Sequence, residues 1–240
     1  MTPILLPIEP SEYFRIKTVH SFAELVAAPF TKGVNALCWP RSLAGDFGAV
    51  VETLGSGEEI VTIEEEQLAR LDLHPAGRAA VGILRDDLRR LREVERDPVL
   101  NSIHRYPRDE APGPVRTDVF SWHADRAPVE ADTFLCTYYG APTEGLPNED
   151  ARRRVDVPEI RAELLAFLEM EEDNAEFGEA LGENCFDLHY APLPRARPYS
   201  FGVGNLWRLA VDWPGSLVPP CIHRAPETEP GQPPRLLMIC

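Results

Sequence analysis

Strand-like sequence occurs in two separate stretches, residues 101–147 and 198–240, which limits the folds open to this chain. Short runs at 133–139, 199–204, 206–211 and 235–240 read as strands, and Gly- and Pro-rich turns separate them. Short strands with such turns are typical of a β-sandwich or a β-barrel. We therefore expect both stretches to fold into one β core, with residues 148–197 inserted between them.

Helical patterns occupy the rest of the chain. The clearest covers residues 75–96, where Leu84, Leu88 and Leu91 recur at helical spacing on one face. A second helix is expected to begin near Pro158, with Asp156 as its cap. It lies in an acidic stretch, residues 162–194, which contains no Lys or Arg.

These patterns together predict an α+β fold in a single domain covering residues 1–240. Residues 1–100 would form a mixed, largely helical N-terminal support, and residues 101–147 and 198–240 would form the β core. Residues 148–197 would form a helical, acidic insertion.

The charge of the chain argues against several classes of partner. There are 39 acidic and 24 basic residues, a formal net charge of −15. Such a surface repels phosphate backbones and anionic lipid headgroups, so we expect neither nucleic-acid nor membrane binding. The first residues lack the basic start of a secretory signal. The five cysteines are scattered and form no C-x-x-C pair, which favours a reduced, cytoplasmic protein.

One group of residues points to chemistry. His123 and Asp125 form an H-x-D pair, which on a strand would place both side chains on one face. With His223, which lies just before the last predicted strand, they would complete two histidines and one carboxylate. This ligand set leaves open positions and is typical of non-haem Fe(II) oxygenases. Arg235, on that last strand, could bind a carboxylate in bidentate fashion. The alternative to a metal site is that His123 is a hydrogen-bonded core residue, Asp125 a turn residue and His223 part of a proline-rich loop.

The order of these residues resembles that of the 2-oxoglutarate/Fe(II)-dependent oxygenases, whose core is a double-stranded β-helix, or jelly roll. A closer resemblance is to the uncharacterised bacterial family DUF1826. It rests on the H-x-D pair, on Leu-Cys-Thr-Tyr-Tyr-Gly at 135–140 with Thr-Glu at 143–144, on His-Arg-Ala-Pro at 223–226, and on Arg235. It covers mainly residues 115–240. The acidic insertion and the single arginine before the last strand depart from that pattern.

The resemblance implies a jelly-roll core and an Fe(II)- and 2-oxoglutarate-dependent enzyme. His123, Asp125 and His223 would hold the iron and be the catalytic residues. Arg235, with Tyr138 or Tyr139, would bind 2-oxoglutarate. O₂ and a small polar substrate, for example one like an amino acid, would react to give a hydroxylated, desaturated or cyclised product with succinate and CO₂. Residues that could contact this substrate are Arg224, Asn101 and His104.

Two other hypotheses remain open from the sequence. A metal-dependent jelly-roll oxidase or cupin-like enzyme would not use 2-oxoglutarate, and Arg235 would then bind the carboxylate of its substrate. A non-catalytic jelly-roll binding protein would use the same residues for a structural metal or for none. No feature of the sequence predicts an oligomeric state.

Overall fold

The structure is a computed structural model that describes residues 8–55, 57, 59–109, 113–227 and 231–240. Residues 1–7 lie outside the described residues, and they are most of the segment in which no secretory signal was expected. The described chain has a mixed α+β fold, as predicted. Its α-helices are α1 (Phe22–Ala27), α2 (Phe47–Leu54), α3 (Glu65–Arg70), α4 (Pro75–Arg92), α5 (Pro158–Phe167) and α6 (Ala175–Glu183). Four 3₁₀ turns are described: η1 (Pro10–Glu12), η2 (Asn148–Asp150), η3 (Arg154–Asp156) and η4 (Phe186–Leu188).

The first of two sheets has the strand order β1-β2-β11-β6-β13-β4-β3. Its pairs are antiparallel except for β1 with β2. Both predicted strand-rich stretches contribute to it, and the N-terminal region adds three strands. Its members are β1 (Ile16–Thr18), β2 (Ala36–Trp39), β3 (Ile60–Thr62), β4 (Val99–Ile103), β6 (Asp132–Tyr139), β11 (Leu206–Ala210) and β13 (Arg235–Ile239).

The second sheet has the order β10-β7-β12-β5-β9-β8, and its described pairs are all antiparallel. Its strands are short, and residues far apart in the chain meet on neighbouring strands. Its members are β5 (Trp122–His123), β7 (Glu144–Leu146), β8 (Ala151–Arg153), β9 (His189–Pro192), β10 (Tyr199–Ser200) and β12 (Ile222–Arg224).

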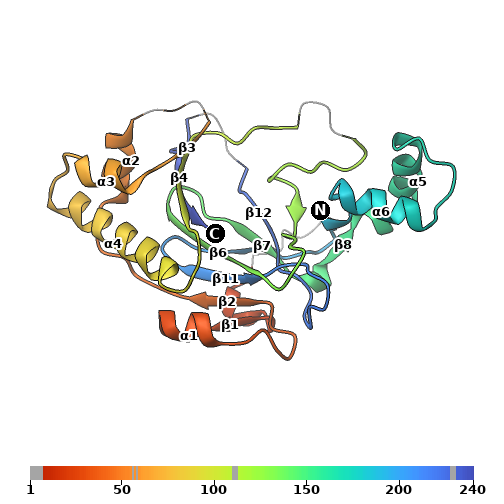
Figure 1. Ribbon diagram of the computed structural model, residues 1–240, viewed down its shortest axis with the longest axis horizontal. Coiled ribbons are helices and arrows are strands. Elements are labelled where there is room, and N and C mark those ends of the chain that lie inside the picture. Colours follow the sequence, from red (N-terminus) through yellow and green to blue (C-terminus); the bar gives the residue numbers. More distant parts are fainter. Residues whose placement is uncertain (1–7, 56, 58, 110–112, 228–230) are drawn as a thin grey trace.

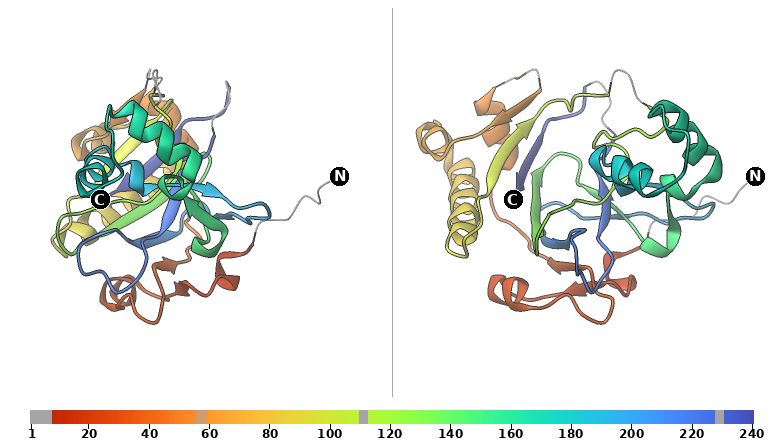
Figure 2. Two further views of the ribbon diagram at one scale, coloured as in Figure 1. Left: turned by 90° about the vertical axis from the view of Figure 1, so that its right-hand side faces the viewer. Right: turned by 45° about the vertical axis from the view of Figure 1, so that its right-hand side comes forward.

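The two sheets curl around a shared interior to give a half-barrel (Figures 1 and 2). We call the face of each sheet that is turned toward the other its inner face. One apolar cluster joins the sheets across this interior and includes Leu135, Trp207 and Leu237 of the first sheet and Tyr199 of the second. The hydrophobic effect thus holds the sheets together around the space between them.

A second apolar cluster covers the outer face of the first sheet. Helices α2, α3 and α4 pack there, at the left of Figure 1. The predicted stripe Leu84, Leu88 and Leu91 is buried against this face, which confirms the amphipathic helix. That helix is shorter than expected, because α4 ends at Arg92 rather than at residue 96.

A buried ion pair links α4 to this sheet. Arg41 Nη1 donates to both oxygens of Asp87, at 2.8 and 2.7 Å, and the hydroxyl of Tyr138 on β6 donates to Asp87 Oδ2 at 2.7 Å. Asp87 is only 3% exposed. A charge buried this deeply is tolerated when it is paired and hydrogen-bonded, so the three groups depend on one another.

The 148–197 segment differs from the prediction of a purely helical insertion. It does contain α5 and α6, which lie together at the right of Figure 1. It also contributes β8 and β9 to the second sheet, with β9 paired to β5. The strand runs at 189–192 and 151–153 are short and bordered by prolines or charges, so their pattern was too weak to stand out.

Two local predictions were wrong. Asp156 does not cap α5, whose N-cap is Val157; its carboxylate instead forms an ion pair with Arg153, at 3.0 Å. The strand expected over 199–204 contains only Tyr199–Ser200, because Gly202 and Gly204 both adopt positive φ angles and turn the chain.

No helix in the described part of the chain combines the length and apolar character needed to cross a membrane. All five cysteines are free thiols, which agrees with the absence of a disulfide framework in the sequence. Cys38, Cys136 and Cys221 are buried, as small apolar residues often are.

Replacing Asp87 with Ala should lower the free energy of unfolding by about 3–5 kcal/mol, because Arg41 would be left as a buried charge without its carboxylate. Denaturant unfolding would measure this. The neighbouring Asp86 is exposed on the same helix, so Asp86→Ala is the matched control and should change stability by less than about 0.5 kcal/mol. Equal stabilities of the two variants would contradict a structural role for the Arg41–Asp87 pair.

Candidate metal centre

The strand that carries His123 is only two residues long, and its position is set by contacts on both sides. Before it, the side chain of Asp118 accepts hydrogen bonds from the backbone N–H groups of Phe120 and Ser121, at 3.2 and 3.3 Å. After it, the N–H of Ala124 donates to the carbonyl of Leu188. These contacts hold β5 between β12 and β9.

His123 lies directly opposite His223 on β12 and directly opposite His189 on β9. Residues that face each other across antiparallel strands project from the same side of the sheet. The ring centroids of His123 and His223 are accordingly 4.6 Å apart, and those of His123 and His189 are 5.8 Å apart. Three imidazoles therefore form a row on one face of the sheet.

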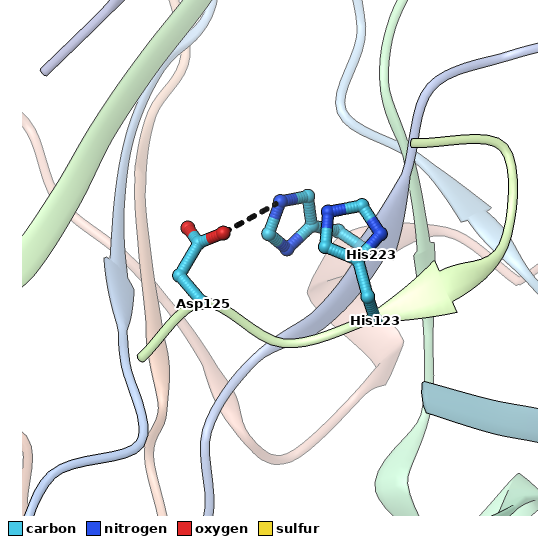
Figure 3. Close-up of side chains that lie close together, drawn as sticks. All are labelled: His123, Asp125 and His223. Carbon is cyan, nitrogen blue, oxygen red and sulfur yellow. Dashed lines mark ion pairs between the residues drawn. The ribbon is translucent and has the colours of Figure 1, made fainter. Parts of the chain in front are cut away.

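Asp125 completes the predicted group (Figure 3). One ligand atom from each of His123, Asp125 and His223 can be chosen so that all three lie within 4.8 Å of one another. Asp125 Oδ1 lies 3.9 Å from Nε2 of His223. The structure thus brings together the three residues that the sequence singled out, although Asp125 follows β5 rather than lying within it.

Both imidazoles present the correct nitrogen for a metal. Nδ1 of His123 lies 2.7 Å from the carbonyl of Ser121, and Nδ1 of His223 lies 3.3 Å from the carbonyl of Cys221. A carbonyl only accepts, so each Nδ1 carries the proton and each Nε2 keeps its lone pair. Such backbone acceptors also fix the ring orientation of metal-binding histidines.

The carboxylate of Asp125 is oriented in the same manner. The hydroxyl of Thr133 on β6 donates to Asp125 Oδ2 at 2.6 Å, which leaves Oδ1 directed toward His223. Burial alone would raise the pKa of Asp125, but the nearby imidazole of His223 and the Thr133 hydrogen bond outweigh it, and the pKa lies below its usual value. Asp125 is therefore ionised near neutral pH, as a metal ligand must be.

His123 is neutral under the same conditions. Burial and the nearby His223 lower its pKa to about 4, although Ser121 and Asp125 act in the opposite direction. A neutral imidazole can donate its Nε2 lone pair without first losing a proton. The donor set, two imidazole nitrogens and one carboxylate oxygen, suits divalent Fe, Mn, Co or Zn.

Arg235 lies on the first sheet and is 1% exposed. Its guanidinium donates to the carbonyl of Ala141 at 2.7 Å and to the hydroxyl of Tyr106 at 2.6 Å. It also donates to the hydroxyls of Thr143 at 2.9 Å and Thr137 at 3.3 Å. All four partners are neutral, and within the described ranges no carboxylate forms an ion pair with Arg235.

A buried guanidinium without a counter-ion is unusual, because burial of a charge is costly unless an opposite charge compensates it. Burial accordingly lowers the pKa of Arg235 from its usual value. In a chain with 39 acidic residues, a position where no described acid pairs with a buried arginine is notable. The neutral partners hold the guanidinium in one orientation and leave its charge without a counter-ion among the described residues.

The predicted role of Tyr138 and Tyr139 in binding 2-oxoglutarate is wrong, because neither side chain faces the interior. Tyr138 is buried on the outer face and donates to Asp87. Tyr139 packs against the same outer cluster. The physical reason is a bulge: Leu236 is paired with Tyr139 and Leu237 with Thr137, so β6 contains one extra residue and the alternation shifts.

Two of the three predicted substrate contacts are also wrong. Arg224 follows His223 and faces the other side of β12, where it donates to Glu144 at 2.7 Å and covers the ring of Trp122. His104 lies on the outer side of the first sheet, 3.3 Å from Ser102 Oγ.

Asn101 differs from these two. It is directly opposite Leu237, on the inner face, and its Oδ1 accepts a hydrogen bond from Thr62 at 2.9 Å. Its role as a substrate contact stays a prediction.

Sequence reasoning missed several residues that shape this site. Thr133 orients Asp125, Tyr106 and Thr143 hold Arg235, and His189 continues the histidine row. Thr137 and Thr143 belong to the motifs on which the family resemblance rests, and this was the one feature of the sequence that could have pointed to them. Nothing in the spacing of His189 connects it to His123, because only the pairing of β9 with β5 brings them together.

Comparisons of the chain with protein-family models, with curated proteins and with solved structures find no match. The resemblances to the 2-oxoglutarate-dependent oxygenases and to DUF1826 therefore stay predictions, and the argument for function depends on the geometry of this site.

Replacing Thr133 with Val should weaken Fe(II) binding by about 10–100-fold, because Asp125 would lose the hydrogen bond that orients it. Anaerobic titration with Fe(II) would measure the dissociation constant. Thr137→Val is the matched control on the same strand: Thr137 contacts Arg235 rather than Asp125, so the affinity for Fe(II) should not change. Equal effects of both substitutions, or none from either, would argue against the role of Thr133.

Proposed function

We propose that this protein is a non-haem Fe(II)- and 2-oxoglutarate-dependent oxygenase that acts on a small polar molecule. The observation that carries the proposal is the pairing of two features in one half-barrel. One is the His123–Asp125–His223 group with free ligand atoms, and the other is the buried, uncompensated guanidinium of Arg235.

We also propose that the core is a jelly roll. Eight strands form this core, and in chain order they are β4, β5, β6, β7, β10, β11, β12 and β13. If they are numbered 1 to 8, strands 1, 3, 6 and 8 belong to the first sheet and strands 2, 4, 5 and 7 to the second. Within the sheets their order is 6-3-8-1 and 5-4-7-2, as in two interleaved Greek keys. The strands β1, β2, β3, β8 and β9 extend the sheets at their edges.

The residues present fit the cofactors. Two imidazoles with free Nε2 atoms and one ionised carboxylate form a facial set that leaves room for further ligands on a divalent iron. 2-Oxoglutarate has one carboxylate and an oxo group that can chelate such a metal, and a distal carboxylate that needs a cation. Arg235 would supply that cation from the opposite sheet. Four of its five N–H groups already donate to neutral partners, so the carboxylate would receive one hydrogen bond from Nη1 together with the positive charge.

When both are bound, iron and 2-oxoglutarate supply the activation of O₂ needed to oxidise an unactivated C–H bond, with release of succinate and CO₂. The chain's own residues act by positioning. Ser121 and Cys221 fix the tautomers of His123 and His223, and Thr133 directs Asp125. Tyr106 and Thr143 aim the guanidinium of Arg235.

A metal-dependent enzyme that does not use 2-oxoglutarate would share the three metal ligands. In that case Arg235 would bind the carboxylate of the substrate itself. The two hypotheses differ in whether 2-oxoglutarate binds to the iron-loaded protein in the absence of any other molecule.

Anaerobic addition of Fe(II) and then 2-oxoglutarate should produce the weak visible charge-transfer band of the chelate. We expect no band with His223→Ala, because the metal loses a ligand. With Arg235→Ala, 2-oxoglutarate should bind about 10–100-fold more weakly, through loss of a charge-assisted hydrogen bond. Tyr106→Phe is a milder test that removes one contact to Arg235 and should weaken binding in the same direction.

Arg224→Gln is the matched control, since Arg224 is adjacent to His223 in sequence but faces the other side of its strand. Its band should match that of the unaltered protein. If iron binds but no band develops with 2-oxoglutarate, the oxygenase proposal is wrong and Arg235 becomes a clamp for a substrate carboxylate. If no metal binds, the enzyme proposal as a whole is wrong.

A further inference from the structure

The histidine row on the second sheet continues past the metal ligands. His189, on β9, is directly opposite His123 and is 4% exposed. Beyond β9, β8 ends at Arg153, and Arg154 begins the 3₁₀ turn η3, which packs against β9. Burial, His123 and the charge of Arg154 together lower the pKa of His189, so Arg154 lies near His189 at the end of the histidine row.

Polar atoms without partners are concentrated around this end of the row. Five buried side-chain polar atoms in the described chain have no hydrogen-bond partner, and three of them are Nε of Arg154, Nδ1 of His189 and Oγ of Ser121. Ser121 is two residues before His123, and the carbonyl of Ser121 accepts a hydrogen bond from Nδ1 of His123. A buried polar group left unpaired destabilises the folded protein, so three such groups in this region indicate a site that is completed by a ligand.

The charges at this position favour an anion. Arg152 and Arg153 both make contacts to Asp156, but no carboxylate of the described residues forms an ion pair with Arg154. The exposed Arg116 lies near enough that its charge, together with burial, lowers the pKa of Arg154. Two guanidinium groups thus lie near each other, and neither forms an ion pair with an acid of the described residues, although the chain has an excess of acids.

We propose that Arg154 and His189, with the hydroxyl of Ser121, bind an anionic oxygen group of the primary substrate next to the metal ligands. This inference depends on the proposed oxygenase function and specifies its substrate as a small carboxylate or phosphate compound. The Nε edge of Arg154 offers two parallel N–H donors, which match either oxyanion. His189 offers an N–H donor, and the serine hydroxyl offers another.

The arrangement separates two anions. Arg235 lies on the first sheet, whereas Arg154 begins the η3 turn that packs against β9 of the second sheet, and His123 and His223 lie on β5 and β12 of that second sheet. The distal carboxylate of 2-oxoglutarate and the anionic group of the substrate would therefore be held by different arginines. A substrate whose anionic group is bound at His189 would have its remaining atoms near the metal, because His123, a metal ligand, is directly opposite His189.

The test uses acetate and inorganic phosphate as separate probes. The protein, loaded with diamagnetic Zn(II) and labelled with ¹⁵N-histidine, is titrated while the imidazole signals are recorded by NMR. The signal that disappears in His189→Gln identifies His189. We expect a saturable shift of that signal with at least one probe, and the probe that binds more tightly distinguishes a carboxylate substrate from a phosphate one.

Arg154→Gln should weaken this binding by about tenfold or more, because it removes a charge-assisted interaction. Arg70→Gln, an exposed position at the end of α3, removes the same charge elsewhere and should leave the binding unchanged. No saturable shift in the unaltered protein, or equal affinity in Arg154→Gln, would overturn the inference.

The same variant separates this inference from the proposed function. With Fe(II) and 2-oxoglutarate, Arg154→Gln should give the same charge-transfer band and the same affinity as the unaltered protein. Loss of the band in this variant would place Arg154 in the 2-oxoglutarate site and would overturn the inference. If the unaltered protein gives no band but the His189 signal still responds to the probes, the oxygenase proposal fails while the anion site stands.

Discussion

The arrangement of the site depends on the antiparallel pairing of one two-residue strand with two others. β5 contributes His123, and its partners β12 and β9 contribute His223 and His189 from distant parts of the chain. Because directly opposed residues share a face, this register places three imidazoles side by side. A shift by one residue would turn His123 away from both partners, so the contacts of Asp118 and Ala124 that hold β5 in place also hold the metal centre.

A second feature of the structure is that two arginines have no acidic partner among the described residues. The chain is strongly acidic overall, and most of the arginines with described contacts are paired with acids, yet Arg235 and Arg154 form no ion pair with any described acid. Arg235 is held by neutral groups inside the half-barrel, and Arg154 lies in the η3 turn against β9. Uncompensated cations in such positions are costly to the folded protein and are therefore expected where a ligand supplies the missing negative charge. The two arginines, on different sheets, suit two different anions.

Much of the site was predictable from the sequence, because its main signals are local. The H-x-D pair, the late histidine and the terminal arginine each follow or lie on a strand-like run, and their types suggest a metal and an anion. The α4 helix was equally clear from its leucine spacing. Either Tyr138 or Tyr139 was expected to face the interior, because one of two neighbouring residues on a regular strand does so. The bulge at Tyr138 breaks that alternation, and no residue type in the run reveals it.

Residue types and their spacing were enough to predict the α+β class, the strand-rich core split by an intervening segment, and the residues able to bind a metal. These follow from residue types and from periods of two and 3.6, which are properties of neighbouring residues. The long-range fold sets which sheet each strand joins, places His189 of β9 beside His123, and leaves Arg154 and Arg235 without an ion pair to any described acid. These depend on long-range strand register and on burial, because a side chain's partners are set by the whole fold rather than by its neighbours in the chain.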